Sequence, residues 1–203
     1  MSGPDLSVIV PCHNPDIGRF IRTLRGLREQ TLEPARWEAI VVDSASDRFP
    51  ADSLFREMRL PGLRLVREPA PGLTAARVRG FREAQGQVCV MVDDDNVLAP
   101  DYLAFGLAAF QGDPRLGAAG GKSLPEFHPD PPAWIREFDG LLALRDLGER
   151  PVRAEWADGS PRDYPGCAPV GAGLAVRRDA ALAYGDAVDR DPLRRGLDRT
   201  GAS

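Results

Sequence analysis

The sequence has few cysteines, no long apolar run and no residues typical of a signal peptide. Its three cysteines, Cys12, Cys89 and Cys167, lack the spacing of a metal site, and so small an odd number indicates a reducing compartment. No stretch approaches the run of about 18 apolar residues that a transmembrane helix needs. The residues before Leu6 lack a basic region. These absences predict a cytoplasmic protein with at most peripheral contact to the inner face of a membrane.

The chain also lacks an excess of positive charge. Its 26 lysine and arginine residues are outnumbered by 30 aspartate and glutamate residues, and the net charge is −4. Lys122 is the only lysine. Because binding of nucleic acid through charge requires a basic footprint, the composition predicts that nucleic acid is not a partner.

The residues that are present suffice for one folded domain. The chain has 203 residues, of which 43% are hydrophobic, and it contains 21 glycines and 19 prolines. This glycine and proline content is high but below the range of disordered segments, so we expect a domain rich in loops.

Strand and helix patterns alternate in the first half. We expect strands at residues 6–10, 37–42, 63–66 and 88–92, with helices after Asp16, at residues 53–58 and at residues 74–84. This order predicts a parallel α/β sheet with right-handed crossovers. Ligands bind beyond the carboxyl ends of such strands. The loops at residues 11–14, 43–47 and 93–96 should therefore meet at one edge.

The second half is less regular. We expect helices at residues 100–110, 132–147 and 178–184, and strands at residues 116–120 and 171–176. Residues 186–203 are polar and charged, and they read as a tail with little to bury.

Three adjacent aspartates, Asp93, Asp94 and Asp95, end the most apolar of the predicted strands. A fold that gathers three carboxylates needs a compensating cation. Carboxylate oxygens are hard ligands that suit Mg²⁺ or Mn²⁺, and these ions bridge protein carboxylates to substrate phosphates. The alternative is a solvated acidic turn, because aspartates are common in turns.

Four motifs occur in a fixed order, namely SVIVPCHN, EAIVVDSASD, PGLTAARVRG and VMVDDDN, and GAGLAVRRDA follows at residues 171–180. In this order the chain resembles family 2 glycosyltransferases of the GT-A fold, over roughly residues 6–184. The resemblance implies a Rossmann-like, mostly parallel sheet flanked by helices. It implies a single domain over residues 1–203, with a nucleotide-binding half at 6–98, an acceptor-side half at 99–185 and the tail at 186–203.

The resemblance also implies roles on the nucleoside side of the site. Pro11, His13 and Asn14 would line the base and ribose of a nucleotide, although many relatives carry tyrosine at the position of His13. Asp43 would accept a hydrogen bond from the base. From the residues alone, the alternative is that Asp43 is a turn or helix-cap aspartate.

On the phosphate side, the resemblance implies that Arg77 pairs with phosphate or ribose, that Asp93 and Asp94 contact ribose and sugar, and that Asp95 ligates Mn²⁺ or Mg²⁺. From the residues alone, Arg77 could be a solvated surface arginine. The implied reaction moves a sugar from a nucleotide-diphosphate donor to a hydroxyl of a saccharide or lipid-linked acceptor, with inversion and metal dependence.

The chain departs from the family where the catalytic base is expected. Family members carry an acidic base, often in a Gly-Glu-Asp stretch, downstream of the GAG strand, and this chain has DRDPLRRGLDRTGAS there. Asp191 and Asp198 lack the Glu-Asp context, so the catalytic residue stays unassigned and is expected beyond Ser203. A non-catalytic nucleotide-sugar-binding module, or a fragment without its base, is therefore an alternative. A nucleotidyltransferase fits less well, because PCHNPD is not a glycine-rich phosphate loop.

Overall fold

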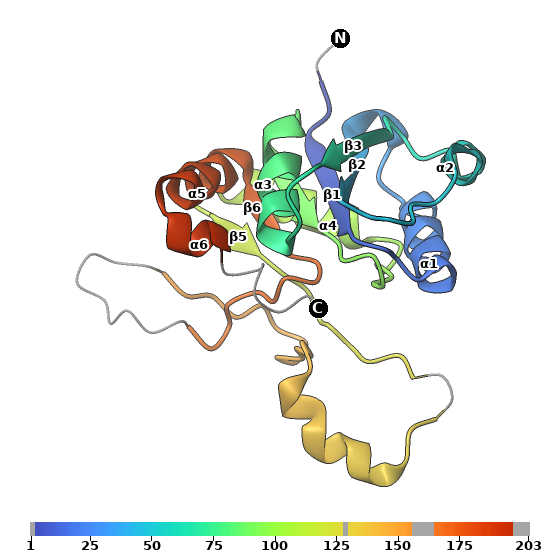
Figure 1. Cartoon of the computed structure of the whole chain (residues 1–203). Helices are drawn as coiled ribbons and strands as arrows, with labels where there is room; N and C mark the ends of the chain where they lie inside the picture. Colours follow the sequence, from blue (N-terminus) through green and yellow to red (C-terminus); the bar gives the residue numbers. More distant parts are fainter. Residues whose placement is uncertain (1–2, 128–129, 156–164, 197–203) are drawn as a thin grey trace.

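A six-stranded sheet organises the protein, with the strand order β3-β2-β1-β4-β6-β5 (Figure 1). The computed structural model describes residues 3–127, 130–155 and 165–196. The strands are β1 (Leu6–Cys12), β2 (Trp37–Ser44), β3 (Arg64–Glu68), β4 (Val88–Met91), β5 (Ala118–Ala119) and β6 (Ala175–Arg177). The helices are α1 (Ile17–Arg28), α2 (Asp52–Met58), α3 (Leu73–Glu83), α4 (Tyr102–Gly112), α5 (Arg178–Arg190) and α6 (Pro192–Gly196), with 3₁₀ helices η1 (Pro34–Arg36) and η2 (Ala133–Leu141).

The predicted parallel α/β sheet is confirmed for the first four strands. β3, β2, β1 and β4 pair in parallel, whereas β6 is antiparallel to β4, and β5 is antiparallel to β6. The sheet is therefore mostly parallel with a mixed edge. Because β6 runs in the opposite direction, its first residues lie at the same edge as the carboxyl ends of β1, β2 and β4.

The core lies on both faces of the sheet, because β1 is buried along its whole length. On one face, Val8 packs with residues of α1 and α4, and on the other, Ile9 packs with residues of α3 and α5. A Cβ added at Gly80 in α3 would lie 2.3 Å from Cγ2 of Ile9. Helix α3 therefore rests directly on β1, at a distance that only glycine permits.

Two elements near the carboxyl end of the chain have bounds that differ from the predicted ones. The strand expected at 171–176 begins only at Ala175, because Gly173 adopts a φ of +77°. The expected polar tail is wrong for residues 186–190, which continue α5. Ala181, Gly185 and Val188 recur at helical spacing and are buried, so the buried face of α5 extends into the predicted tail at Val188.

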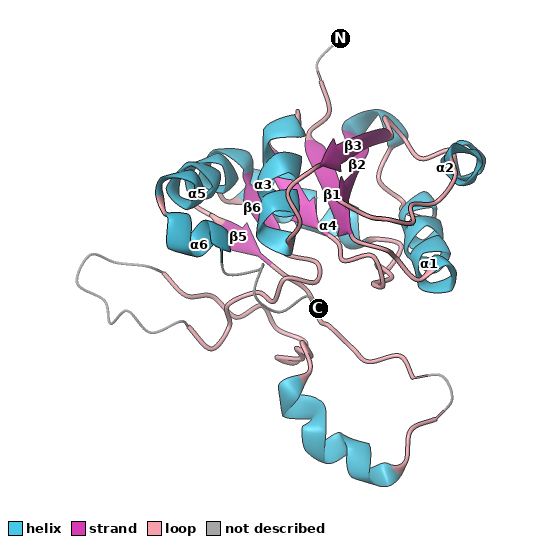
Figure 2. Ribbon diagram, viewed as in Figure 1, coloured by secondary structure: helices cyan, strands magenta, loops and turns pink. Residues whose placement is uncertain are grey.

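The helix expected at 132–147 is also wrong in type and length. Residues 133–141 form the 3₁₀ helix η2, in the segment that extends away from the sheet in Figure 2. Trp134 is 59% exposed and Leu141 is 82% exposed. Most helical stability comes from packing of an apolar face, and these apolar side chains remain exposed.

Tyr102, on α4, makes hydrogen bonds to both ends of the segment that connects β5 to β6. Its hydroxyl donates to the carbonyl oxygen of Gly173 and accepts from the backbone N–H of Gly121 at 3.0 Å. A Cβ added at Gly120 would lie 2.8 Å from Cβ of Pro169. The chain that leaves β5 thus returns beside its starting point before it enters β6.

Within the described residues, no helix has both the length and the apolar character needed to cross a bilayer.

Candidate functional site

The loops that follow β1, β2 and β4 meet at the carboxyl-terminal edge of the sheet, as predicted. Cys12 pairs with Asp43 in the β1–β2 ladder, and the N–H of Val92 donates to the carbonyl oxygen of Ile9 at 3.0 Å. The N–H of Asn14 donates to Oγ of Ser46 at 2.8 Å, which joins the first two loops directly.

His13 and Asn14 hold these two loops together. Nδ1 of His13 lies 2.6 Å from the carbonyl oxygen of Ser44, and Nε2 lies 3.1 Å from Nδ2 of Asn14. A carbonyl oxygen only accepts and an amide nitrogen only donates, so the contacts fit a neutral imidazole protonated at Nδ1. Oδ1 of Asn14 accepts from the N–H groups of Asp47 and Arg48 at 3.0 and 2.9 Å. The two side chains are exposed at the edge but already have protein partners.

Pro11 differs from these neighbours. It is buried inside β1, where it pairs with Val42. In this conformation Pro11 offers little surface to a ligand, and its predicted contact with a nucleoside stays a prediction.

Two residues other than glycine adopt left-handed backbone conformations at this edge. Asn14 has a φ of 46° and Ala45 has a φ of 51°. Such conformations persist only where the surrounding structure enforces them, and they cluster at ligand sites. The hydrogen bonds from the β1 loop to the β2 loop are the enforcing contacts here.

Asp43 lies at the end of β2 and is only 4% exposed. Oδ1 accepts from the N–H of Ser46 at 3.0 Å, and Oδ2 accepts from Nη1 of Arg67 at 2.9 Å. Arg67 comes from β3, directly opposite Asp43 in the strand register. Sequence reasoning missed Arg67, because the predicted third strand ends at residue 66. Alignment of the carboxyl ends of neighbouring strands would have placed it beside Asp43.

The three aspartates lie just after β4, with Asp93 and Asp94 half-buried and Asp95 exposed. Burial raises the pKa of Asp94 to about 6, and repulsion from Asp95 and Asp93 adds to the effect. The side chain of Thr23 on α1 donates to the carbonyl oxygen of Asp94 at 3.0 Å and fixes the backbone. The predicted gathering of like charge is therefore present.

Arg77 lies near the start of α3 and faces both the aspartates and the segment before β6. Its Nη2 is 3.5 Å from Oδ1 of Asp93, and a Cβ at Gly171 would lie 2.9 Å from the same nitrogen. Nε of Arg77 is buried without a hydrogen-bond partner among the described residues. A buried unpaired donor is unfavourable, so this guanidinium has capacity for a further acceptor.

The acidic loop fits a divalent cation in chemistry but does not form a closed site. Across residues 3–127, 130–155 and 165–196, no group of three or more His, Cys, Asp or Glu side chains could hold a metal ion. Carboxylate oxygens are the ligands that Mg²⁺ and Mn²⁺ prefer, and Mg²⁺ is commonly held by one or two carboxylates plus phosphate and water. The role of Asp95 as a ligand stays a prediction.

The acidic residues nearest to the expected base motif are Asp191 and Asp198. Oδ1 of Asp191 accepts from the N–H groups of Leu193 and Arg194 at 3.0 and 3.3 Å, so Asp191 caps α6. Asp198 lies outside the described residues. The structure assigns neither one as a base.

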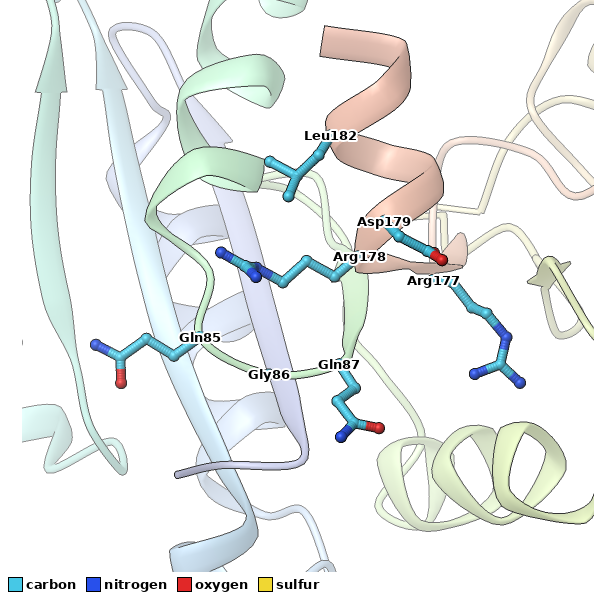
Figure 3. Close-up of a pocket in the computed structure, with 7 residues that line it drawn as sticks. All are labelled: Gln85, Gly86, Gln87, Arg177, Arg178, Asp179 and Leu182. Carbon is cyan, nitrogen blue, oxygen red and sulfur yellow. The ribbon is translucent and has the colours of Figure 1, made fainter. Parts of the chain in front are cut away.

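A cavity of about 320 Å³ lies at the opposite, amino-terminal edge of the parallel strands (Figure 3). It is lined by residues 85–87 before β4 and by Arg177, Arg178, Asp179 and Leu182 around the start of α5. Arg177 donates to the carbonyl oxygens of Leu116, Phe110 and Asp113, so its guanidinium is used to anchor α4 and β5. This cavity is separate from the candidate site.

Comparison with known proteins matches this architecture to one family. The model of the family described as Glycosyl transferase family 2 matches residues 7–167. An N-acetylglucosaminyltransferase of Sinorhizobium fredii is 29% identical over 129 residues, which cover 59% of this chain and 29% of that protein. The chain spans 17% of the length of one curated relative that it matches and 35% of another.

Solved structures give the same result. The mannosyltransferase PcManGT of Pyrobaculum calidifontis, solved with GDP-Man and Mn²⁺, is 30% identical with a TM-score of 0.51, over 60% of this chain and 36% of that one. TarS of S. aureus is 21% identical with a TM-score of 0.51, over 60% of this chain and 23% of that one, and it shows likeness of fold. Because the family model spans most of its length, this chain belongs to glycosyl transferase family 2, and its sheet has the GT-A fold.

Proposed function

We propose that this domain binds a nucleotide-diphosphate sugar and a divalent cation at the carboxyl-terminal edge of its sheet. As part of a glycosyltransferase, it would pass the sugar to a hydroxyl of a saccharide or lipid-linked acceptor, with inversion. The observation that carries the proposal is the meeting of Asp43, Arg77 and the three aspartates at this edge in a family 2 chain. The GDP-Man and Mn²⁺ bound by PcManGT support a nucleotide-sugar donor.

The nucleoside is assigned to the loops after β1 and β2. Asp43 accepts a hydrogen bond from the base, because a buried carboxylate held by Ser46 and Arg67 is a fixed acceptor. His13 and Asn14 shape the wall beside the base and ribose, since both are exposed and held by partners in the protein.

The diphosphate is assigned to Arg77. Its guanidinium lies beside Asp93 and keeps an unpartnered buried Nε, and arginine donors match phosphate oxygens in geometry. Asp93 and Asp94 accept hydrogen bonds from hydroxyls of ribose and sugar.

Asp95 would hold Mn²⁺ or Mg²⁺, with the other ligands supplied by phosphate and water. When bound, the cation neutralises charge on the departing diphosphate. Burial is the main reason that the pKa of Asp94 is raised, and repulsion from Asp95 and Asp93 adds to it, so a bound cation would relieve the repulsive part.

A nucleotide-sugar-binding module without catalysis is the second candidate. The observation that favours it is the use of Asp191 as the cap of α6, which removes one acidic residue from consideration as the base. Metal-dependent binding without hydrolysis or transfer of the donor would separate this candidate from the first.

Calorimetric titration with UDP- and GDP-sugars, with and without Mn²⁺, tests the proposal. We expect binding that requires Mn²⁺ and that falls at least about ten-fold in Asp95→Asn, since a charged ligand to the metal is lost. Asp186→Asn, on the exposed face of α5, is the matched control and should bind as the unmodified chain does. Failure of every nucleotide sugar to bind would refute the proposal, and unchanged affinity in Asp95→Asn would refute the assignment of the ligand.

A further inference from the structure

We propose that Thr23 and Gln30 are positioning residues of the candidate site, which hold the acidic loop, residues 93–100, in the shape that binds a divalent cation. The inference rests on the proposed function, because it takes the cation to bind at Asp95. Both residues lie outside the acidic loop, on α1 and just after it.

One side of α1, together with the residues just after it, lies along the acidic loop. The hydroxyl group of Thr23 is fully buried and donates to the carbonyl oxygen of Asp94 at 3.0 Å. Seven residues further on, Nε2 of Gln30 donates to the carbonyl oxygen of Ala99 at 2.8 Å. Oε1 of Gln30 accepts from the N–H of Leu103 at 3.1 Å. The acidic loop is therefore held near both of its ends by side chains of one other segment.

Between these two contacts the acidic loop lies directly on the helix. A Cβ added at Gly26, which is buried in α1, would lie 2.9 Å from Cγ1 of Val97 and 3.4 Å from the backbone nitrogen of Leu98. Glycine is the residue that allows this approach without displacement. Nε2 of Gln30 also donates to the carbonyl oxygen of Gly26 at 3.0 Å, which fixes the Gln30 side chain. Spacings of three and four residues place Thr23, Gly26 and Gln30 on one side of the helix.

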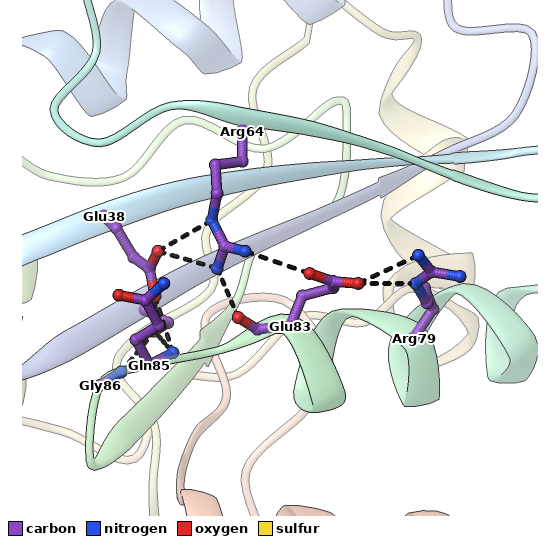
Figure 4. A network of polar contacts seen from close by, with 7 residues as sticks. Glu38, Arg64, Arg79, Glu83, Gln85 and Gly86 are labelled. Carbon is purple, nitrogen blue, oxygen red and sulfur yellow. Dashed lines mark hydrogen bonds and ion pairs between the residues drawn. The ribbon is translucent and has the colours of Figure 1, made fainter.

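The three aspartates need such a restraint because adjacent carboxylates repel one another. Nη2 of Arg77 lies beside them, at 3.5 Å from Oδ1 of Asp93. At the other edge of the sheet, Glu38 and Glu83 share the guanidinium of Arg64, so opposite charge holds these carboxylates together (Figure 4). A loop with an excess of negative charge and no restraint would lower its energy by spreading its carboxylates apart. The contacts from α1 oppose this spreading.

A loop that is ordered before binding gives a higher affinity, because binding then does not have to order it. The hydroxyl group of Thr23 also lies 3.4 Å from the carbonyl oxygen of Arg19, so its contact to Asp94 is the closer of the two. Without this hydroxyl group, the peptide between Asp94 and Asp95 would lose its anchor on α1. Partners that orient metal ligands typically contribute ten-fold or more to the affinity for the metal.

The experiment titrates Mn²⁺ into the unmodified chain and its variants at saturating UDP or GDP, by calorimetry, and measures the Mn²⁺ concentration at half-saturation. We expect this concentration to rise about ten-fold in Thr23→Val, which has the same shape without the hydroxyl group, and in Gln30→Met. Thr23→Ser keeps the hydroxyl group and should recover most of the affinity. Thr31→Val removes an exposed hydroxyl group just beyond α1, and as the matched control it should change nothing.

Denaturant titration of the same variants separates positioning from stability alone. If Thr23→Val is less stable but keeps the half-saturating Mn²⁺ concentration, the inference is overturned and the proposed function stands. An equal rise in Thr31→Val would also overturn it, because the effect would then be unspecific. Should Thr23→Val fail to fold, an unchanged value in Gln30→Met would overturn it. If neither UDP nor GDP binds to the unmodified chain with Mn²⁺, the proposed function fails and the inference fails with it.

Discussion

Charged side chains are paired differently at the two edges of the sheet. At the amino-terminal edge, Glu38 accepts from Ser7, Arg64 and the N–H of Gln85, and Arg64 reaches on to Glu83. At the carboxyl-terminal edge, Asp93, Asp94 and Asp95 face one another with Arg77 at 3.5 Å as a weak partner of Asp93. The charges of the first edge are internally paired, whereas at the second edge Asp43 is paired with Arg67 but the three aspartates leave an excess of negative charge. This difference indicates that the first edge supports stability and that the second is built to receive a ligand.

The largest expected change in the free energy of unfolding is at the amino-terminal edge, where the charges are paired. Glu38→Ala should lower the free energy of unfolding by about 3 kcal/mol, because it leaves Arg64 and the donors of Ser7 and Gln85 without their buried acceptor. Denaturant titration measures the change. Glu57→Ala, at an exposed position of α2, is the control and should alter stability by less than about 0.5 kcal/mol. A loss below about 1 kcal/mol in Glu38→Ala would contradict the structural role of this edge.

A substitution at the carboxyl-terminal edge is expected to have a smaller effect on the free energy of unfolding than Glu38→Ala, and to raise it rather than lower it. The pKa of Asp94 is about 6 in the folded chain and has an ordinary value of 3.8. Between these values the folded state binds more protons than the unfolded state, so the contribution of Asp94 to stability falls as pH rises from about 4 to about 6. Asp94→Asn should therefore be more stable than the unmodified chain at pH 7, by about 1 kcal/mol after allowance for solvent screening.

Denaturant titrations of both proteins across this pH range, in buffer with a chelator, measure that difference. It should grow from pH 4 to pH 6 and stay level above. A difference that shrinks with rising pH would mean that Asp94 is stabilised by a partner, and the contrast between the edges would be lost.

The smallest change in the free energy of unfolding is expected at the exposed outer end of the Glu38–Arg64–Glu83 network. Arg79 pairs with Glu83 at 3.0 Å across one turn of α3, and its side chain is 39% exposed. Arg79→Ala should lower the free energy of unfolding by only about 0.4 kcal/mol, since exposed pairs at this spacing contribute little. A thermal melt beside Glu38→Ala gives the comparison. A loss as large as that of Glu38→Ala would show that the network depends on its outer member.

The sequence predicted the parallel half of the fold well, because Leu6, Val8 and Ile9 and their counterparts form short apolar runs that end in polar loops. The positions of Asp43 and Asp93 followed from the rule that the carboxyl ends of parallel strands share an edge. The bounds near β6 did not follow, because the run GAGLAV at residues 171–176 was read as one strand while Gly173 adopts a positive φ.

The partners of the site residues were not visible in the sequence. Arg67 pairs with Asp43 across two strands, and this depends on a register that the sequence pattern fixes only to within a residue or so. Asn14 is predicted to line the base and ribose, but the pattern did not indicate that its Oδ1 also accepts from the N–H groups of Asp47 and Arg48. Such contacts form between loops, and loops have no periodic sequence pattern from which these contacts could be predicted.

The closure at Tyr102 divides the chain into parts that can change independently. The segment between β5 and β6 leaves and re-enters at one edge, with Gly121 and Gly173 held by one hydroxyl group. Because lengthening a loop whose ends are already joined has a small entropic effect, this segment can be extended or exchanged while β1, β2 and β4 keep their register. The two hydrogen bonds of Tyr102 thereby hold both ends of this segment beside the edge of the sheet where β1, β2 and β4 end.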